Sequence, residues 1–156
     1  MKKLAALISA AALCVIPSMA SPAGFVWKWV LTVNKDSVYI GEHTDDESNA
    51  IFCDKPLTGF VNFHLHVETD PPTSDPPWKT HMTIRSGAAT VTVAGEATPN
   101  EDAGGSDVIV KLPVKSPVVA AFGKTGALKM TAMGYTSDSP SVPVAQSAKL
   151  VKLCGG

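Results

Sequence analysis

Short runs of β-forming residues, separated by clusters of turn-forming residues, recur along almost the whole chain. Each run is rich in Val, Ile, Thr or aromatic residues, and most of the 12 glycines and 12 prolines lie between runs. The expected strands are 25–33, 37–43, 50–54, 59–68, 78–85, 89–97, 107–113 and 127–135. Turn signals at intervals of roughly 8–12 residues are typical of antiparallel sandwiches and barrels. We therefore expect a mainly β protein, an antiparallel β-sandwich of about eight strands.

Two segments depart from this pattern and predict one or two short helices. The first begins with Ser116 and Pro117, which suit a helix N-cap and a first helical position. It ends near Gly123 and Gly126, which favour a helix stop. The C-terminal tail alternates first like a strand and then places small or apolar residues at every third position. The second half of that tail is compatible with another short helix.

Residues 1–20 have the features of a secretory signal peptide. Two lysines precede an apolar run, a proline ends the run, and the small residues Ser-Met-Ala follow. The apolar run is short for a membrane span, although a retained membrane anchor is the alternative. We expect cleavage after Ala20, which leaves 21–156 as a single domain in the periplasm or outside the cell. No second apolar run is long enough to span a membrane, so we do not expect an integral membrane protein.

The charge of the expected mature chain is mild. Without Lys2 and Lys3, 11 basic and 14 acidic residues remain, and they are scattered along the sequence. Binding of nucleic acid requires a dense basic surface that neutralises phosphates. We therefore expect no nucleic-acid partner.

Cys53 and Cys154 remain after cleavage of the expected signal peptide. An even number of cysteines in an exported chain favours a disulfide, because thiols are oxidised outside the cytoplasm. The bridge would tie the middle of the domain to its last residues. A metal site that uses both cysteines is the alternative, but the sequence has no Cys-x-x-Cys pair to support it.

Three of the four histidines lie between positions 62 and 85. If 59–68 and 78–85 form a hairpin, one register places His66 opposite His81, with His64 beside them on the same face. Three neutral imidazoles at that spacing are suitable ligands for Zn²⁺ or Cu²⁺. The sequence therefore yields the hypothesis of a transition-metal site. The alternative is that these histidines only line a solvent-exposed strand.

The segment 69–77 between those two strands is rich in proline and aspartate. Its candidate binding residues are Asp70, Pro71, Pro72, Asp75, Pro76 and Pro77. Prolines order a loop in advance and so reduce the entropy lost when the loop binds a partner. One hypothesis is that the protein inhibits a cell-wall hydrolase through this loop. The alternative is a stiff connection between strands.

The sequence contains no motif for catalysis. It lacks a phosphate-binding loop, a dinucleotide fingerprint, a nucleophile elbow and a His-Glu-x-x-His zinc motif. Scattered serines, aspartates and histidines occur in any chain of this size. We therefore expect a non-catalytic, exported binding or accessory protein whose partner is another protein or an envelope component.

The order of features resembles a group of small exported proteobacterial proteins. These features are a tryptophan pair soon after the signal peptide ("VWKW"), a strand pair that ends at Cys53, and an arginine before a turn ("THMTIRSG"). A short helix that leads into a strand ("SPVVAAFGKTGALKMTA") and a terminal segment that ends at Cys154 complete the order. Members of this group include type VI secretion-associated accessory proteins and proteins like invasion-associated locus B. The resemblance implies a disulfide-closed periplasmic β-domain.

Two positions depart from the patterns of these families. The invasion-associated type usually carries a cysteine just after its first tryptophan, and this chain has none there. Ser86 and Gly87 stand where the secretion-associated type has Asp-Gly. The resemblance therefore leaves the function open.

Overall fold

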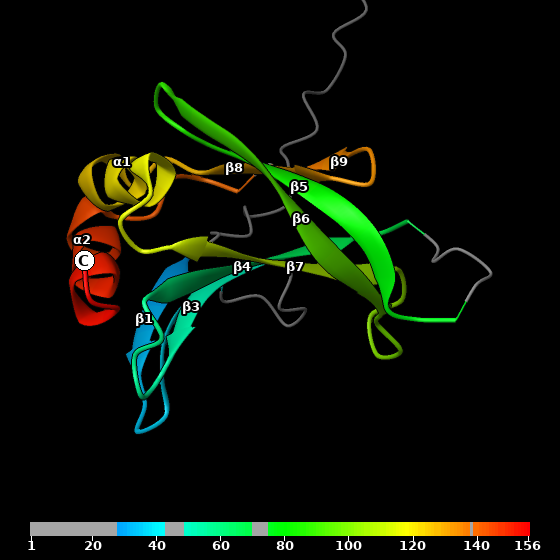
Figure 1. The fold of residues 1–156 in the computed structure, drawn as a ribbon, viewed down its shortest axis with the longest axis horizontal. Coiled ribbons are helices and arrows are strands. Elements are labelled where there is room, and N and C mark those ends of the chain that lie inside the picture. The colour runs from blue at the N-terminus through cyan, green and yellow to red at the C-terminus, as the bar shows by residue number, and fades with distance from the viewer. Residues whose placement is uncertain (1–27, 43–48, 70–74, 138) are drawn as a thin grey trace, which may run out of the picture.

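The computed structural model describes residues 28–42, 49–69, 75–137 and 139–156. This part of the chain forms nine strands and two helices (Figure 1). The strands are β1 (Trp29–Val33), β2 (Ser37–Glu42), β3 (Asn49–Asp54), β4 (Phe60–Val67), β5 (Trp78–Ser86), β6 (Ala89–Pro99), β7 (Ser106–Pro113), β8 (Lys129–Ala132) and β9 (Tyr135–Thr136). The helices are α1 (Pro117–Thr125) and α2 (Val144–Leu153).

All nine strands belong to one antiparallel sheet in the order β1-β2-β3-β4-β7-β6-β5-β8-β9. The sheet twists strongly, so that the hairpin of β5 and β6 crosses β4 and β7 at an angle (Figure 1). The mainly β class and the antiparallel pairing are confirmed, but the strands form a single curled sheet. The expected arrangement of two facing sheets is absent from the described residues. Alternation gives each strand one apolar face both in a two-sheet sandwich and in a single curled sheet, so it does not distinguish between these architectures.

The core lies on one face of the sheet, which we call the inner face. In β4, Val61, Phe63, Leu65 and Val67 are fully buried and alternate with more polar residues. Apolar residues of β2, β3, β5, β7 and β8 lie in the same buried cluster. A period of two along β4 therefore separates the side chains that face the core from those that do not.

The two helices pack together against the inner face (Figure 1). The Ser116 side chain accepts a hydrogen bond from the Val119 N–H, and Pro117 occupies the first turn of α1, as the sequence predicted. Gly126 ends the helix in the left-handed region. Val118, Val119 and Phe122 of α1, together with Leu150 of α2, fill the core.

A disulfide joins Cys53 in β3 to Cys154, which follows α2. The pairing expected from the sequence is confirmed. Both cysteines lie in the buried cluster, so the bond ties α2 to the inner face of the sheet. No helix in the described parts of the chain is both long enough and apolar enough to cross a membrane.

The metal-site hypothesis depended on a hairpin between 59–68 and 78–85, and these two strands do not pair with each other. Instead, β4 pairs along its full length with β7, and β5 pairs with β6 and β8. The tight turn after Ser86 provides β5 with a nearer partner in β6, and β7 matches the alternation of β4 over eight positions. The segment 69–77 therefore connects two strands that are not neighbours.

Candidate functional site

Two of the three candidate histidines meet at one carboxylate on the outer face of the sheet. His66 of β4 lies directly opposite Asp107 of β7, and its Nδ1 is 3.0 Å from Asp107 Oδ1. His64 Nε2 approaches the same oxygen at 3.2 Å. The exposed fraction of the side chain is 18% for His64, 13% for His66 and 23% for Asp107. The three side chains therefore form a partly buried polar cluster.

Asn100 adds a third group to this cluster. Its side-chain amide donates to both oxygens of Asp107, at 3.3 and 3.1 Å, while its own carbonyl accepts from the N–H groups of Asp102 and Ala103. Burial raises the pKa of Asp107, but the hydrogen bonds and the nearby imidazoles outweigh burial and hold that pKa below its ordinary value. Asp107 is therefore a stable anion that fixes two histidines and the turn after β6.

His81 does not join the other two histidines. It lies on β5 opposite Ala94, and both β7 and β6 separate β5 from β4. His81 is therefore not a neighbour of His66 in the sheet. In the described ranges, no group of three or more His, Cys, Asp or Glu side chains has the geometry to hold a metal ion.

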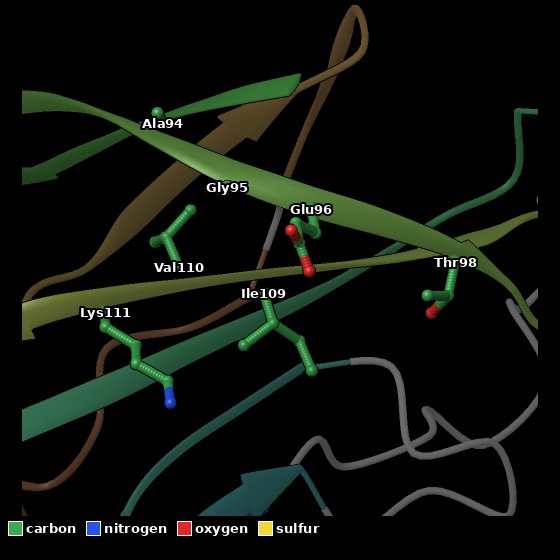
Figure 2. Close-up of a pocket in the computed structure, with 7 residues that line it drawn as sticks. All are labelled: Ala94, Gly95, Glu96, Thr98, Ile109, Val110 and Lys111. Carbon is green, nitrogen blue, oxygen red and sulfur yellow. The ribbon is translucent and has the colours of Figure 1, made fainter. Parts of the chain in front are cut away.

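The cluster borders a hollow where β6 and β7 separate. These strands pair only from Glu96 opposite Ile109 to Pro99 opposite Ser106. On the N-terminal side of Glu96, β6 pairs with β5 alone, whereas β7 continues to pair with β4 after Ile109. Figure 2 shows the resulting space, which opens to the outer face. Its volume is about 440 Å³, and its lining residues are Ala94, Gly95, Glu96, Thr98, Ile109, Val110 and Lys111.

The hollow combines an apolar surface with charged residues. Ile109 lines the hollow and is 39% exposed, so it offers an accessible aliphatic surface there. Glu96 forms an ion pair with Lys79 on the β6 side, and Lys111 lies on the β7 side. Ile109 is also opposite His64 in the register of β4 and β7. The hollow and the polar cluster thus form one continuous surface.

A close contact fixes the shape of the hollow. A Cβ on Gly95 would lie 2.4 Å from Val110 Cγ1 and 2.7 Å from the Ile109 carbonyl oxygen. Only glycine allows the two strands to cross this closely before they separate.

The predicted binding loop is described only in part. Asp70, Pro71 and Pro72 lie outside the described residues. Asp75, Pro76 and Pro77 are exposed and lead directly into β5. The hypothesis of inhibition through this loop stays a prediction.

Sequence reasoning missed Asp107, Asn100 and Ile109. Alternation in "DVIVKLP" does place Asp107, Ile109 and Lys111 on the polar face of one strand. It does not reveal that this strand lies beside His64 and His66, because pairing partners are not encoded in the alternation of one strand.

Comparison with models of protein families, with curated proteins and with solved structures found no match.

Proposed function

We propose that this chain is an exported, non-catalytic binding or accessory protein whose partner docks on the outer face of the sheet. The partner is another protein or an envelope component, and its contact centre is the hollow between β6 and β7. The observation that carries the proposal is the exposed Ile109, which lines a hollow in the outer face of the sheet. Sites of this kind combine an apolar surface with a few fixed polar groups.

The polar cluster supports a binding role for the same surface. His64, His66 and Asn100 hold Asp107 in one orientation, so docking does not have to order these side chains. Preorganised groups reduce the entropy lost on association. Exposed apolar area beside a rigid polar rim is the usual anatomy of a protein interface.

Export accounts for the disulfide. A bond between Cys53 and Cys154 persists in an oxidising compartment and is rare in the cytoplasm. The features of residues 1–20 point the same way. We therefore assign the protein to the periplasm or the extracellular space.

Neither alternative has an observation that favours it over docking on the outer face. The metal-binding hypothesis required His81 beside His66, and these residues lie on strands that are not neighbours. The hydrolase-inhibitor hypothesis depends on a loop whose middle is outside the described residues.

Substitution of Ile109 tests the proposal. The experiment captures envelope proteins on immobilised wild-type protein, on Ile109→Arg and on Val144→Arg, and compares the retained sets by quantitative mass spectrometry. Val144 is the matched control, because it is 51% exposed and lies on α2. We expect at least one protein to be retained by wild type and by Val144→Arg and lost with Ile109→Arg. The purified partner should then bind wild type and not Ile109→Arg in solution. If the three retained sets are identical, the hollow is not the binding site.

A further inference from the structure

Charge is distributed unevenly along the chain, between residues 21–113 and the segment 114–156 that contains α1, β8, β9 and α2. Residues 114–156 contain five lysines and one acidic residue, Asp138. Residues 21–113 contain six basic and 13 acidic residues. The segment that carries both helices is therefore basic, although the expected mature chain as a whole is acidic.

A groove runs between α1 and α2 on the side that faces solvent. Its volume is about 460 Å³, and its lining residues are Ala120, Gly123, Lys124, Ala148, Val151, Lys152 and Gly156. Ala120 and Ala148 are exposed, whereas Val151 is half-buried. The floor of the groove is thus apolar, and one lysine comes from each helix.

Close packing of the helices makes the groove a fixed feature. A Cβ on Gly123 would lie 3.2 Å from Val151 Cγ2, so α1 and α2 pack closely at this position. The disulfide at Cys154 holds the end of α2 to the sheet. Little reorganisation is required before a ligand enters.

The two helices and the segment just before α1 carry more lysines than the two that stabilise the helix C-termini. Lys124 and Lys152 lie in the last turns, where a positive charge stabilises the helix dipole. Lys149 is in the middle of α2 and exposed, and Lys115 precedes α1 and is also exposed. The sequences of α1 and α2 contain no acidic residue that would pair with these lysines within the helices.

We propose that the groove between α1 and α2 binds an acidic amphipathic helix of a partner protein. The apolar side of that helix would contact Ala120, Ala148 and Val151, and its carboxylates would face Lys124 and Lys152. Helix-in-groove recognition uses this combination of an apolar floor and a charged rim. Complementary charge accelerates association and excludes partners of the wrong sign.

The shape of the surface favours a helix over a lipid bilayer. Helices that insert into a membrane surface present large apolar residues such as Trp, Phe or Leu. The exposed apolar residues at this groove are alanines, and they line a shallow groove between two helices. This site is separate from the hollow on the outer face, so either proposal can fail alone.

Binding of designed peptides tests the inference. The first probe is a fluorescent amphipathic peptide with leucine at helical spacing and glutamate elsewhere, and the second replaces every glutamate with lysine. We expect the purified, oxidised protein to bind the acidic peptide at least about tenfold more tightly than the basic one, a difference of about 1.4 kcal/mol. Added salt should weaken this binding, because the rim charges are exposed.

Two variants and one control locate the contact. Lys124→Glu combined with Lys152→Glu should weaken binding of the acidic peptide by about tenfold or more. Ala148→Trp fills the groove without a change of charge and should weaken it as well. The control, Lys35→Glu combined with Lys129→Glu, makes the same change of charge at exposed positions outside the groove and should have little effect.

The opposite results would overturn the inference. These are no binding of the acidic peptide, equal binding of both peptides, an equal loss in the control, or no effect of Ala148→Trp. Vesicles of equal parts phosphatidylglycerol and phosphatidylcholine provide the last comparison. Binding to these vesicles without binding to the peptide would assign the basic face to lipid and reject the helix.

Discussion

Cys154 is bonded to Cys53 across 101 positions, which joins the end of α2 to the third strand of the sheet. Both residues are almost fully buried, at 0% and 1% exposure. The bond therefore ties the helix pair to the inner face of the sheet. The groove between α1 and α2 depends on this attachment more directly than the hollow does.

Removal of the disulfide should lower stability without loss of the fold's core. A loop of this length gives a stabilisation of about 4–5 kcal/mol in the chain-entropy model, because the bond restricts the unfolded chain. We expect the Cys53→Ser, Cys154→Ser double variant to lower the free energy of unfolding by an amount of this order. Urea denaturation measures it, and a reducing agent should shift the wild type and leave the double variant unchanged. Reaction of Cys53 or Cys154 with a thiol reagent in the unfolded, unreduced protein would contradict the bond.

The sequence predicted the elements of this fold better than their arrangement. Alternation located most of the strands, although the single strand expected at 127–135 is two strands, β8 and β9, joined by a turn. Ser116, Pro117 and Gly126 marked the ends of α1. Alternation did not predict which strands pair in the sheet, because any two strands with the same period of two can be aligned with each other. Neighbours in sequence suggested β5 beside β4, whereas β7 and β6 lie between them. That long-range pairing is also what brings Asp107 to the two histidines.

Phe63 and Phe60 provide a matched pair on the same strand. Phe63 is fully buried in the core, and Phe60 is 42% exposed at the start of β4. We expect Phe63→Ala to reduce the free energy of unfolding by about 3–5 kcal/mol, because it removes buried surface and leaves a cavity. Phe60→Ala should reduce it by less than about 1 kcal/mol. Equal losses in denaturant titrations would mean that the inner and outer faces are assigned wrongly.

Asp107 should stabilise the fold in a pH-dependent way. Burial raises its pKa. The hydrogen bonds from His66 and Asn100 and the charge of His64 lower the pKa by more than burial raises it, so the pKa lies below the ordinary value of 3.8. A lowered pKa means that the folded state favours the carboxylate. The stabilisation is therefore fully present above pH 3.8 and is lost as the pH falls through the lowered pKa.

The variant Asp107→Asn tests this dependence. We expect its melting temperature to be lower than that of the wild type at pH 5, and the difference to shrink between about pH 4 and pH 2. Asp102→Asn is the control, because Asp102 is exposed. In the described residues, His64 and His66 form their ion pairs with Asp107 and not with Asp102. A difference between wild type and Asp107→Asn that stays constant down to pH 2 would show that the carboxylate charge is not the cause.

Gly126 should be the least replaceable glycine at the base of the helix pair. It adopts a φ of 66° at the end of α1, and a Cβ there would lie 1.8 Å from the Val142 carbonyl oxygen. The Val142 N–H also donates to the Gly126 carbonyl at 2.9 Å, so the segment that leads into α2 is held at this point. An alanine at this position would therefore displace Val142 and, with it, the start of α2.

Gly87 is the control for backbone strain alone, because it has a φ of 56° but a Cβ there would have no atom within 4 Å. Gly87→Ala should cost about 1–2 kcal/mol of stability, and Gly126→Ala should cost about 1–3 kcal/mol more because Val142 must move. Gly126→Ala should also weaken binding of the acidic peptide at the groove, whereas Gly87→Ala should leave that affinity unchanged. Urea denaturation and peptide titration on both variants measure the two effects. Equal losses of stability would show that the contact with Val142 does not constrain the helix pair.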